Sequence, residues 1–595
     1  MTASEKRLAA VRQLMVLENY DALVVPHADE YLGEYIPLRN ERLHWMTGFT
    51  GSAGMALILR DRAAIFVDGR YTVQVRSQVP SHLFDYYHLA DDPQAQWLAA
   101  ALPAGTRVAC DPRLHSLQWC RDTKNTLSDA GVELLLDTDN LIDRCWLDRP
   151  EPVCNSALLL DEAFTGESSE DKRQRIAAQI AAQGCDAALI FAPDSVSWLL
   201  NVRGTDMPQL PVLQSVAILE ASAKMTLFVD ARRLPAGFYQ HVGDGVTVMD
   251  ESDSSDAFAA YANHKVLADA QNAGAWVQME LARYGATLVQ GEDPVLLPKA
   301  CKNALELAGT RSAHIRDAVA EIRFLAWLDG EVAAARLHNE AELSDYLFGL
   351  RQQGEYFHAC SFDTISAAGV NGAMCHYNHL NGVPARLEMD TVYLFDSGGQ
   401  YTDGTTDITR TVAIGDPGAE ARRLFTLVLK GHIALAVARF PPGTTGTQLD
   451  ALARQYLWRA GYDYDHGTGH GVGVFLSVHE GPQRISKHHN GVALAPGMIV
   501  SNEPGYYREG VFGMRCENLQ AVRLSDSDVG EMPMLEFETL TLVPFDVRML
   551  DTALMDIEEV EWLNSYHQSV AAAIGPLLCS SDQNWLLQAT AKISV

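Results

Sequence analysis

Residues 392–414 read VYLFDSGGQYTDGTTDITRTVAI, and this stretch decides the fold of the last third of the chain. β-Branched and aromatic residues fill its two ends, whereas Gly, Asp and Thr fill its middle. This pattern predicts two antiparallel strands that fold back near Tyr401 and Asp403. Asp396 and Asp407 are then expected to lie roughly opposite each other on the ribbon.

A second pair of acidic residues occupies a similar pattern further along the chain. Residues 498–507, MIVSNEPGYY, place Glu503 before a proline, which has no N–H to donate and should close the strand. Residues 513–522, GMRCENLQAV, place Glu517 on the same strand face as Arg515. The turn REGVFG between the two stretches predicts a second hairpin.

One imidazole joins the four carboxylates, because His470 lies in the glycine-rich loop HGTGHGVG. Each of these residues alone has an ordinary explanation as a turn, loop or strand-end residue. Together they form a hard, mostly oxygen ligand set that can hold two divalent ions about 3.5 to 4 Å apart. The sequence therefore predicts a dinuclear metallohydrolase with the metal ligands Asp396, Asp407, His470, Glu503 and Glu517.

The same segments resemble those of the pita-bread metallopeptidases. Around the predicted ligands they read DSGGQY, TTDITR, HGTGHGVG, VHEGP, NEPGYY and RCEN, and elsewhere ERLHWMTGFTGSAG, FVDGRY, WLLNVRGTDMP, FETLTLVP and EWLNSYH. Within this group the chain is most similar to the cytosolic three-domain aminopeptidase P family, the Xaa-Pro aminopeptidases. The resemblance covers essentially the whole chain. It implies release of the N-terminal residue from peptides with proline at the second position.

The resemblance also implies roles for individual residues. His376 in GAMCHYNH and His479 in SVHEGP are expected to contact the substrate near the scissile bond, and Arg70 in FVDGRY to reach the peptide from the N-terminal domain. His466 is expected to support the metal ligands from behind. The predicted catalytic residues are His376, His479 and Glu503, and the predicted substrate-binding residues are Arg70, His376, His470, His479 and Arg515.

A mechanism follows from the chemistry of such a site. A metal-bridging hydroxide is expected to attack the peptide carbonyl, with Glu503 relaying the proton to the leaving nitrogen. His376 and His479 are suited to stabilising the tetrahedral intermediate. Cys516 departs from the family pattern, which has an aliphatic residue there, and it points away from the metals if the strand alternates.

Two alternative functions stay open. The first is a prolidase, which cuts Xaa-Pro dipeptides only, and the second is a non-catalytic binding protein on the same fold. Methionine aminopeptidase and creatinase fit less well, because the former needs no preceding α/β domains and the latter lacks the metal ligands. The presence of all five ligands favours an enzyme, and a duplicated N-terminal region favours aminopeptidase P over prolidase.

Composition agrees with a large cytoplasmic enzyme. The 595 residues carry a formal net charge of -30, which argues against nucleic acid or an anionic membrane as partner. Ten cysteines without CxxC spacing suit reduced thiols, and the first residues lack a signal peptide. The hard donors and the family favour Mn²⁺, with Zn²⁺ or Co²⁺ as alternatives. The family also implies a homodimer.

An internal repeat shapes the first half of the chain. The repeat pairs YDALVVPHADEY with CDAALIFAPDSVSW, and GMALILRDRAAIFVDGRY with SVAILEASAKMTLFVDARRL. Asp21 therefore corresponds to Asp186, and Asp68 corresponds to Asp230. Each copy follows an amphipathic helical stretch, and prolines in LDRPEPVCN separate them. Only the first copy ends in Gly-Arg-Tyr.

The predicted fold class is therefore mixed α/β (α+β), with two duplicated creatinase-like N-terminal α/β domains before a pita-bread catalytic domain. The predicted domains are residues 1–152, 153–305 and 306–595, the last ending in a helical extension around EEVEWLNSYHQSV.

Overall fold

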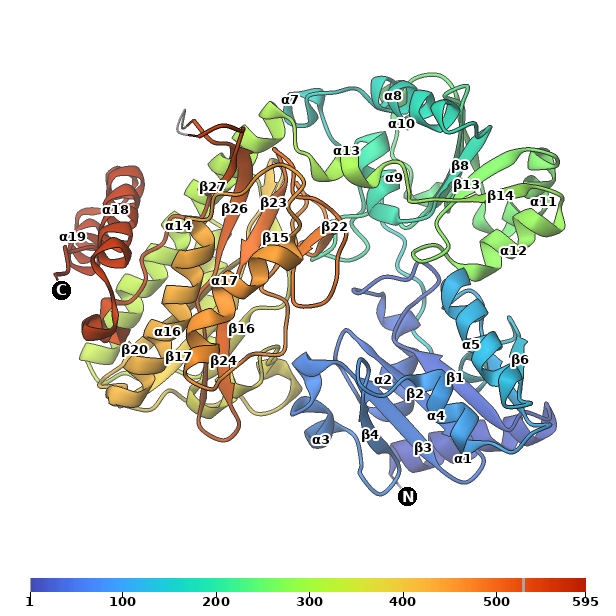
Figure 1. Cartoon of the computed structure of the whole chain (residues 1–595), viewed down its shortest axis with the longest axis horizontal. Helices are drawn as coiled ribbons and strands as arrows, with labels where there is room; N and C mark the ends of the chain where they lie inside the picture. The colour runs from blue at the N-terminus through green and yellow to red at the C-terminus, as the bar shows by residue number, and fades with distance from the viewer. Residues whose placement is uncertain (1, 527–529, 595) are drawn as a thin grey trace. The chain divides into compact units, whose positions relative to one another are not determined.

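The structure is a computed structural model that describes residues 2–526 and 530–594 (Figure 1). The chain forms two compact units. The first unit comprises Met1–Leu159, Glu167–Met207 and Val212–Leu296, and the second comprises Leu160–Gly166, Pro208–Pro211 and Leu297–Val595.

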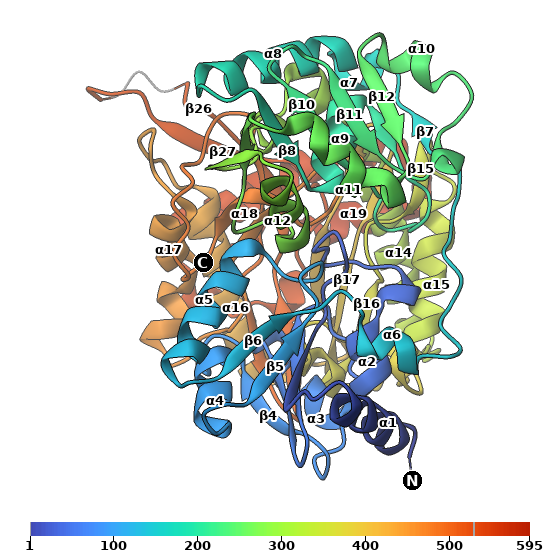
Figure 2. The same cartoon turned by 90° about the vertical axis from the view of Figure 1, so that its right-hand side faces the viewer.

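The first unit opens with a module built on a six-stranded sheet. Its elements are α1 (Ala3–Leu17), β1 (Ala22–Pro26), α2 (Arg42–Thr47), β2 (Gly54–Leu59), β3 (Ala63–Val67), α3 (Gln74–Gln78), β4 (Asp85–His88), α4 (Gln94–Ala101), β5 (Arg107–Cys110), α5 (Leu117–Asp129), β6 (Glu133–Leu136) and α6 (Leu141–Cys145). The strand order is β4-β3-β2-β1-β5-β6. Alternate residues of β1 enter two apolar clusters, one shared with α1, α2 and α6 and the other with α4 and α5. Figure 2 shows α2 and α6 on one side of this module and α4 and α5 on the other.

A second module in the same unit repeats this plan. Its elements are α8 (Ser169–Ala182), β8 (Ala187–Ile190), α9 (Pro193–Leu200), β10 (Val216–Glu220), β11 (Met225–Phe228), α10 (Phe238–Val242), β12 (Val246–Met249), α11 (Ser254–Ala257), β13 (Lys265–Ala268), α12 (Ala275–Arg283) and β14 (Thr287–Gln290). The order β12-β11-β10-β8-β13-β14 matches that of the first sheet strand for strand. The predicted duplication and both leading helices are confirmed. The prolines predicted to separate the copies lie between α6 and the short strand β7 (Leu158–Leu159), which pairs with β9 (Val202–Arg203).

Asp21 and Asp186, at equivalent positions of the repeat, make the same hydrogen bond in the two modules. Asp21 Oδ2 accepts the backbone N–H of Arg107 at 2.9 Å, and Asp186 Oδ2 accepts that of Lys265 at 2.8 Å. Each bond ties the strand start to the parallel strand beside it. The duplicated sequence positions are therefore structural, since they anchor the sheet.

Arg70 lies at the end of β3 in the first module. Its Nη2 pairs with Asp68 at 2.8 Å, and its Nη1 pairs with Glu34 at 2.9 Å. The second module repeats the first of these pairs, because Nη2 of Arg232 pairs with Asp230 at 2.6 Å. The Asp–Arg pair is thus a property of the duplicated module, and a contact of Arg70 with substrate stays a prediction.

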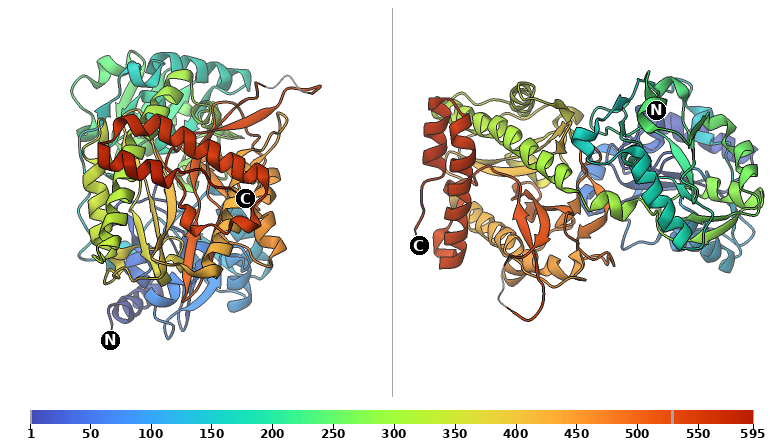
Figure 3. Two further views of the ribbon diagram at one scale, coloured as in Figure 1. Left: turned by 90° about the vertical axis from the view of Figure 1, so that its left-hand side faces the viewer. Right: turned by 90° about the horizontal axis from the view of Figure 1, so that it is seen from above.

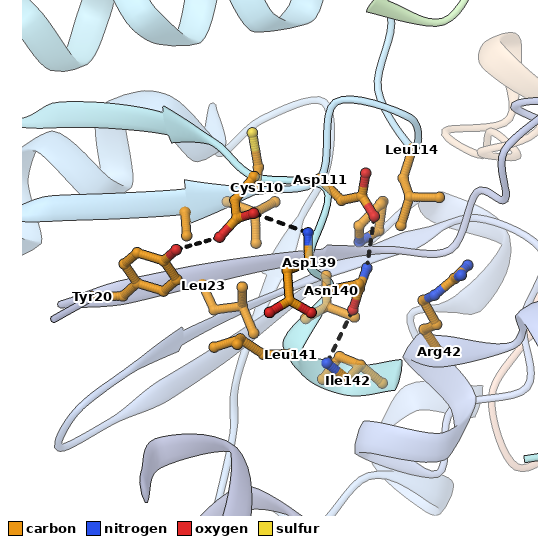
Figure 4. Close-up of a pocket in the computed structure, with 15 residues that line it drawn as sticks. Tyr20, Leu23, Arg42, Cys110, Asp111, Leu114, Asp139, Asn140, Leu141 and Ile142 are labelled. Atoms are coloured by element: carbon orange, nitrogen blue, oxygen red, sulfur yellow. Dashed lines mark hydrogen bonds between the residues drawn. The ribbon is translucent and has the colours of Figure 1, made fainter. Parts of the chain in front are cut away.

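A small cavity lies at the carboxyl ends of β1 and β5 (Figure 4). It measures about 10 Å³, which is room for about one water molecule. Asn140 crosses it, donating to Asp111 Oδ2 at 3.1 Å and accepting from Ile142 N at 3.0 Å. This cavity is too small for a peptide or a nucleotide.

The second unit combines short antiparallel sheets with long helices. Its strands are β15 (Phe357–Cys360), β16 (Ile365–Ala368), β17 (Thr391–Ser397), β18 (Gly399–Tyr401), β19 (Gly404–Thr405), β20 (Ile408–Ile414), β21 (Gly469–Gly471), β22 (Glu480–Ile485), β23 (Ile499–Asn502), β24 (Gly505–Arg508), β25 (Phe512–Arg515), β26 (Asn518–Leu524) and β27 (Leu535–Thr539). They form the sheets β16-β17-β20, β15-β18-β19, β22-β21-β23-β26-β27 and β24-β25.

Helices enclose the strands of the second unit. They are α7 (Glu162–Thr165), α14 (Ala304–Ala333), α15 (Glu340–Arg351), α16 (Gly418–Ala436), α17 (Gly446–Arg459), α18 (Ile557–Ile574) and α19 (Ser580–Ala589), with α13 (Leu296–Ala300) leading into the unit. Apolar residues of α14, α15, α16 and α18 pack with β17 and β20 in one core. The helix predicted near the C-terminus is confirmed as α18, which lies beside α19 and packs on α14 (Figure 3). No helix in the described ranges combines the length and apolarity that crossing a bilayer requires.

Candidate metal centre

The first acidic pair lies where a two-stranded ribbon passes from one sheet into another. β17 pairs with β20, placing Asp396 opposite Thr409, and β18 pairs with β19 beyond the break. The predicted hairpin and its turn after Tyr401 are confirmed. Gly398 permits the break, because a Cβ there would lie 1.9 Å from the carbonyl oxygen of Thr406. Asp407 follows directly, between β19 and β20.

The second acidic pair lies at an equivalent break. Residues 513–522 were expected to form one strand, but the ladder divides, with Glu503 between β23 and β24 and Glu517 between β25 and β26. Pro504 has no N–H, and its carbonyl accepts the N–H of Cys516 at 3.1 Å across the break. The flanking pairs are Asn502 with Asn518 and Gly505 with Arg515. Cys516 is fully buried in the apolar core, as expected from strand alternation.

His470 lies close to one carboxylate from each of the two strand breaks. Its Nε2 lies 3.4 Å from Oδ2 of Asp407 and 3.5 Å from Oε1 of Glu503. Its Nδ1 donates to the carbonyl oxygen of Gly471 at 2.9 Å, which leaves Nε2 facing the carboxylates. Ligand atoms of Asp407, His470 and Glu517 lie within 4.8 Å of one another, close enough to hold a metal ion together.

Thr409 and Arg515 connect the two acidic pairs. The Thr409 hydroxyl donates to Oε2 of Glu517 at 2.6 Å and accepts from Nε of Arg515 at 2.9 Å. Arg515 also forms an ion pair with Asp396 and donates to the Tyr507 hydroxyl at 2.6 Å. The guanidinium of Arg515 is thus committed to site residues, and its predicted contact with substrate stays a prediction.

Burial sets the electrostatics of this site. It raises the pKa of Asp396 to about 7, and it raises the pKa of Glu503 and, much further, that of Glu517, with neighbouring carboxylates adding to each rise. Burial lowers the pKa of His470, but its hydrogen bond to Asp407 and the charge of Glu503 outweigh that effect and raise the pKa to about 9. Four carboxylates thus face the cationic groups Arg515 and His470, so the site carries an excess of negative charge.

The residues present fit divalent cations. Among the described residues, Oδ1 of Asp396 is one of the buried side-chain oxygens without a hydrogen-bond partner. Such an oxygen is costly unless a cation takes the place of a donor. Carboxylates with a single imidazole are also the donors that hard divalent ions prefer. The five predicted ligands therefore form a donor set that suits divalent cations. They are Asp396, Asp407, His470, Glu503 and Glu517.

The three other predicted histidines lie around this cluster. The ring of His479 lies 4.4 Å from that of His470, centroid to centroid. Nε2 of His466 lies 2.9 Å from the Tyr507 hydroxyl, which also accepts from Arg515, and the supporting role of His466 stays a prediction. His376 is half-buried, and the carbonyl oxygen of the preceding residue accepts from Nη1 of Arg515 at 3.4 Å.

Two hydroxyl groups of the site were not predicted from the sequence. Thr409 binds Glu517, as described above, and Oγ of Ser501 donates to Oε1 of Glu503 at 3.1 Å while accepting the N–H of His470 at 2.9 Å. Each hydroxyl stands two residues from a predicted ligand, Asp407 or Glu503. Period-2 spacing on a strand face was the signal that could have found them.

Comparisons with known proteins agree with this architecture. Models of known families match the metallopeptidase family M24 at residues 308–523, the creatinase/prolidase N-terminal domain at 7–145 and again at 148–306, and the C-terminal region of peptidase M24 at 533–593. Aminopeptidase P1 of Lotus japonicus is 35% identical over 99% of this chain and 100% of its own length. The chain belongs to the aminopeptidase P family of metallopeptidases.

Other members of the aminopeptidase P family extend the match. A probable Xaa-Pro aminopeptidase P of Tuber melanosporum is 38% identical over 95% of both chains. The crystal structure of X-prolyl aminopeptidase from Caenorhabditis elegans, described as a cytosolic enzyme with a dinuclear active site, superposes with a TM-score of 0.95 at 31% identity over 100% of both chains. An Xaa-Pro dipeptidase of Bacillus anthracis, 22% identical, covers 64% of this chain with a TM-score of 0.50 and shares the fold only.

The raised pKa values predict a pH-dependent response to metal. At pH values between the ordinary and the raised pKa, Asp396 and His470 bind more protons in the folded metal-free protein than in the unfolded chain. The free energy of unfolding of the metal-free protein therefore falls as the pH rises through this range. Cations displace those protons, and the rise in Tm on adding Mn²⁺ should be larger at about pH 8 than at about pH 5.5. Calorimetry with and without Mn²⁺ measures it, and an equal or smaller rise at the higher pH would contradict the assignment.

Replacing Thr409 with valine should weaken metal binding. Thr409→Val keeps the side-chain shape but removes the donor to Glu517 and the acceptor for Arg515. Affinity for Mn²⁺ should fall about 10- to 100-fold, the usual effect of losing a group that orients a ligand. Isothermal titration of the chelator-treated protein measures it, with Thr402→Val, outside the site, as control. Unchanged affinity in Thr409→Val would show that the hydroxyl does not orient Glu517.

Proposed function

We propose that this chain is a metal-dependent Xaa-Pro aminopeptidase, which hydrolyses the bond before a proline at the second position of a peptide. The observation that carries this proposal is the meeting of Asp407 and Glu517, at the two strand breaks, with His470 of β21. Membership of the aminopeptidase P family supports it, as do relatives of matching length named aminopeptidase P1 and probable Xaa-Pro aminopeptidase P.

The cations are proposed to be two Mn²⁺ ions, with Zn²⁺ or Co²⁺ as alternatives. Oxygen-rich ligands suit Mn²⁺. The ligands would be Asp396, Asp407, His470, Glu503 and Glu517. Bound there, a metal pair polarises a carbonyl oxygen and lowers the pKa of a water molecule.

Glu503 is the proposed proton relay. Its Oε1 already accepts from Ser501 at 3.1 Å, which leaves Oε2 to accept a proton from the attacking water and deliver it to the leaving proline nitrogen. The relay thus uses a carboxylate that the fold already holds in place.

His376 and His479 are proposed to bind the substrate beside the scissile bond. A neutral or protonated imidazole N–H can donate to the carbonyl oxygen as negative charge develops on it. His470 and Arg515 would orient these groups from the ligand side, with His466 behind them. Arg70 is proposed to contact the peptide as well.

The location, assembly and domain division of the enzyme are proposed as well. We propose a cytoplasmic location, since all ten cysteines are free thiols and the nematode relative is described as cytosolic. A homodimer and the three domains 1–152, 153–305 and 306–595 are proposed with it. The matched ranges of the family models support this division.

Peptide length separates the two peptidase hypotheses. Chelator-treated protein supplied with Mn²⁺ should release free arginine from Arg-Pro-Pro and leave Arg-Ala-Ala intact. Activity should return with metal and disappear with chelator. Chromatography of the products measures it. Cleavage confined to an Xaa-Pro dipeptide would instead identify a prolidase, and no cleavage of either would favour the binding-protein alternative.

His479→Ala tests the substrate-binding assignment. Loss of one preorganised donor should lower kcat on Arg-Pro-Pro about 10²- to 10³-fold. Metal content should stay at the wild-type value, because His479 is not a proposed ligand. Stopped assays with elemental analysis of the same samples measure both. A loss of bound metal in His479→Ala would make this residue part of the metal site instead.

A further inference from the structure

We propose that Glu340 is a positioning residue that fixes the loop carrying His376. The inference rests on the proposed function in one respect, since it takes His376 to contact the substrate. Glu340 is the first residue of α15 and has no solvent exposure. A buried carboxylate is stable only when its oxygens are fully bonded, so the identity of its partners shows what it holds.

Every partner of the Glu340 carboxylate comes from the last residue of β16 or from the loop that connects β16 to β17. Oε1 accepts from the N–H of Ala368 at 2.8 Å and from Nδ2 of Asn371 at 2.8 Å. Oε2 accepts from the hydroxyl of Tyr377 at 2.8 Å and from the N–H of Ala385 at 2.7 Å. One side chain therefore holds both ends and the middle of the loop.

The bonded positions bracket His376. Tyr377 is its immediate neighbour, and the Tyr377 hydroxyl also accepts from Nδ2 of Asn371 at 3.0 Å. The backbone N–H of Glu340 adds a fifth tie, since it donates to the carbonyl oxygen of Ala385 at 2.9 Å. The direction of His376 thus depends on a loop whose shape is dictated by one carboxylate.

The far side of the loop rests against the metal centre. Gly372 packs so closely on β25 that a Cβ on Gly513 would lie 1.7 Å from the Gly372 carbonyl oxygen. Nη1 of Arg515 then reaches the carbonyl oxygen of Cys375 at 3.4 Å, and Arg515 pairs with Asp396. The loop is therefore clamped between Glu340 and the strand that leads to Glu517.

Glutamine at position 340 is the matched disruption. Glu340→Gln keeps size and shape, but its amide NH₂ must face two of the four loop donors, whichever way it turns. Tyr377 can reverse its hydroxyl, whereas the backbone N–H groups of Ala368 and Ala385 cannot accept. Asp345→Asn, which removes an exposed negative charge from the same helix, is the control.

The test compares five proteins on Arg-Pro-Pro: wild type, Glu340→Gln, His376→Ala, the double variant and the control Asp345→Asn. Glu340→Gln should lower kcat about 10- to 100-fold with a smaller change in KM and unchanged metal content, and Asp345→Asn should match wild type. If Glu340 acts through His376, the double variant should be no slower than His376→Ala alone. Losses that multiply in the double variant, or metal lost with kcat, would overturn the proposal.

A second readout keeps this inference separate from the proposed function. Hydrogen exchange by mass spectrometry should show faster exchange over residues 368–386 in Glu340→Gln than in Asp345→Asn, whether or not the wild type cleaves any peptide. Unchanged exchange there would overturn the clamp even in an active enzyme. Should Glu340→Gln fail to fold, Tyr377→Phe serves as the second variant, because it removes one of the four donors to Glu340. This change should lower kcat about 3- to 10-fold and speed hydrogen exchange over residues 368–386. Wild-type values of kcat and of exchange in Tyr377→Phe would also overturn the proposal.

Discussion

Burying four carboxylates around one imidazole is the constraint on which the catalytic unit depends. Asp396, Glu517 and Asp407 are each less than a tenth exposed, and the charged groups facing them are Arg515 and His470. Like charges held together out of water repel strongly, so a fold can keep them there only with fixed donors and cations. The strand breaks meet this demand, because they turn acidic residues inward without exposing unpaired backbone.

The helices stabilise the breaks with buried ion pairs of their own. Arg351 of α15 pairs with Asp317 of α14 at 2.7 Å and also binds Ser397, the neighbour of Asp396. Asp317 in turn accepts from the hydroxyl of Thr406, the neighbour of Asp407, at 2.9 Å. One buried pair therefore binds side-chain hydroxyls on both sides of the first break, and this geometry explains why charged residues occupy the interior of α14 and α15.

The loop before His470 is held in the same manner. Nη2 of Arg454 on α17 donates to the carbonyl oxygen of His466 at 2.8 Å, and Nε of Arg454 pairs with Asp450 at 2.6 Å. Asp450 also binds the hydroxyl of Thr468 in the HGTGH segment. Charged groups on neighbouring helices thus fix both segments, and a rigid site costs less to organise when a substrate arrives.

Local patterns explain what the sequence could predict and where it failed. Strand alternation and turn residues were enough for both hairpins, and helical spacing was enough for α1, α8 and α18. The division of residues 513–522 was missed because Pro504 acts across the ladder, on Cys516, rather than along its own strand. The structural roles of Arg454 and Glu340 could not be predicted, since a charged residue in a helix is expected to lie on the solvent-exposed face until its burial is known.

The N-terminal repeat shows which contacts of Arg70 belong to the duplicated module and which are its own. FVDGRY drew attention to Arg70, yet FVDARR places Arg232 on the equivalent aspartate, so the arginine itself belongs to the module. The two copies differ in surroundings: the side chain of Arg70 is 21% exposed and also pairs with Glu34, whereas that of Arg232 is 73% exposed. Ser52 completes the first environment, bonding Glu34 at 2.8 Å and Tyr71 at 2.7 Å. Any role of Arg70 toward a peptide must therefore come from this polar cluster rather than from the motif.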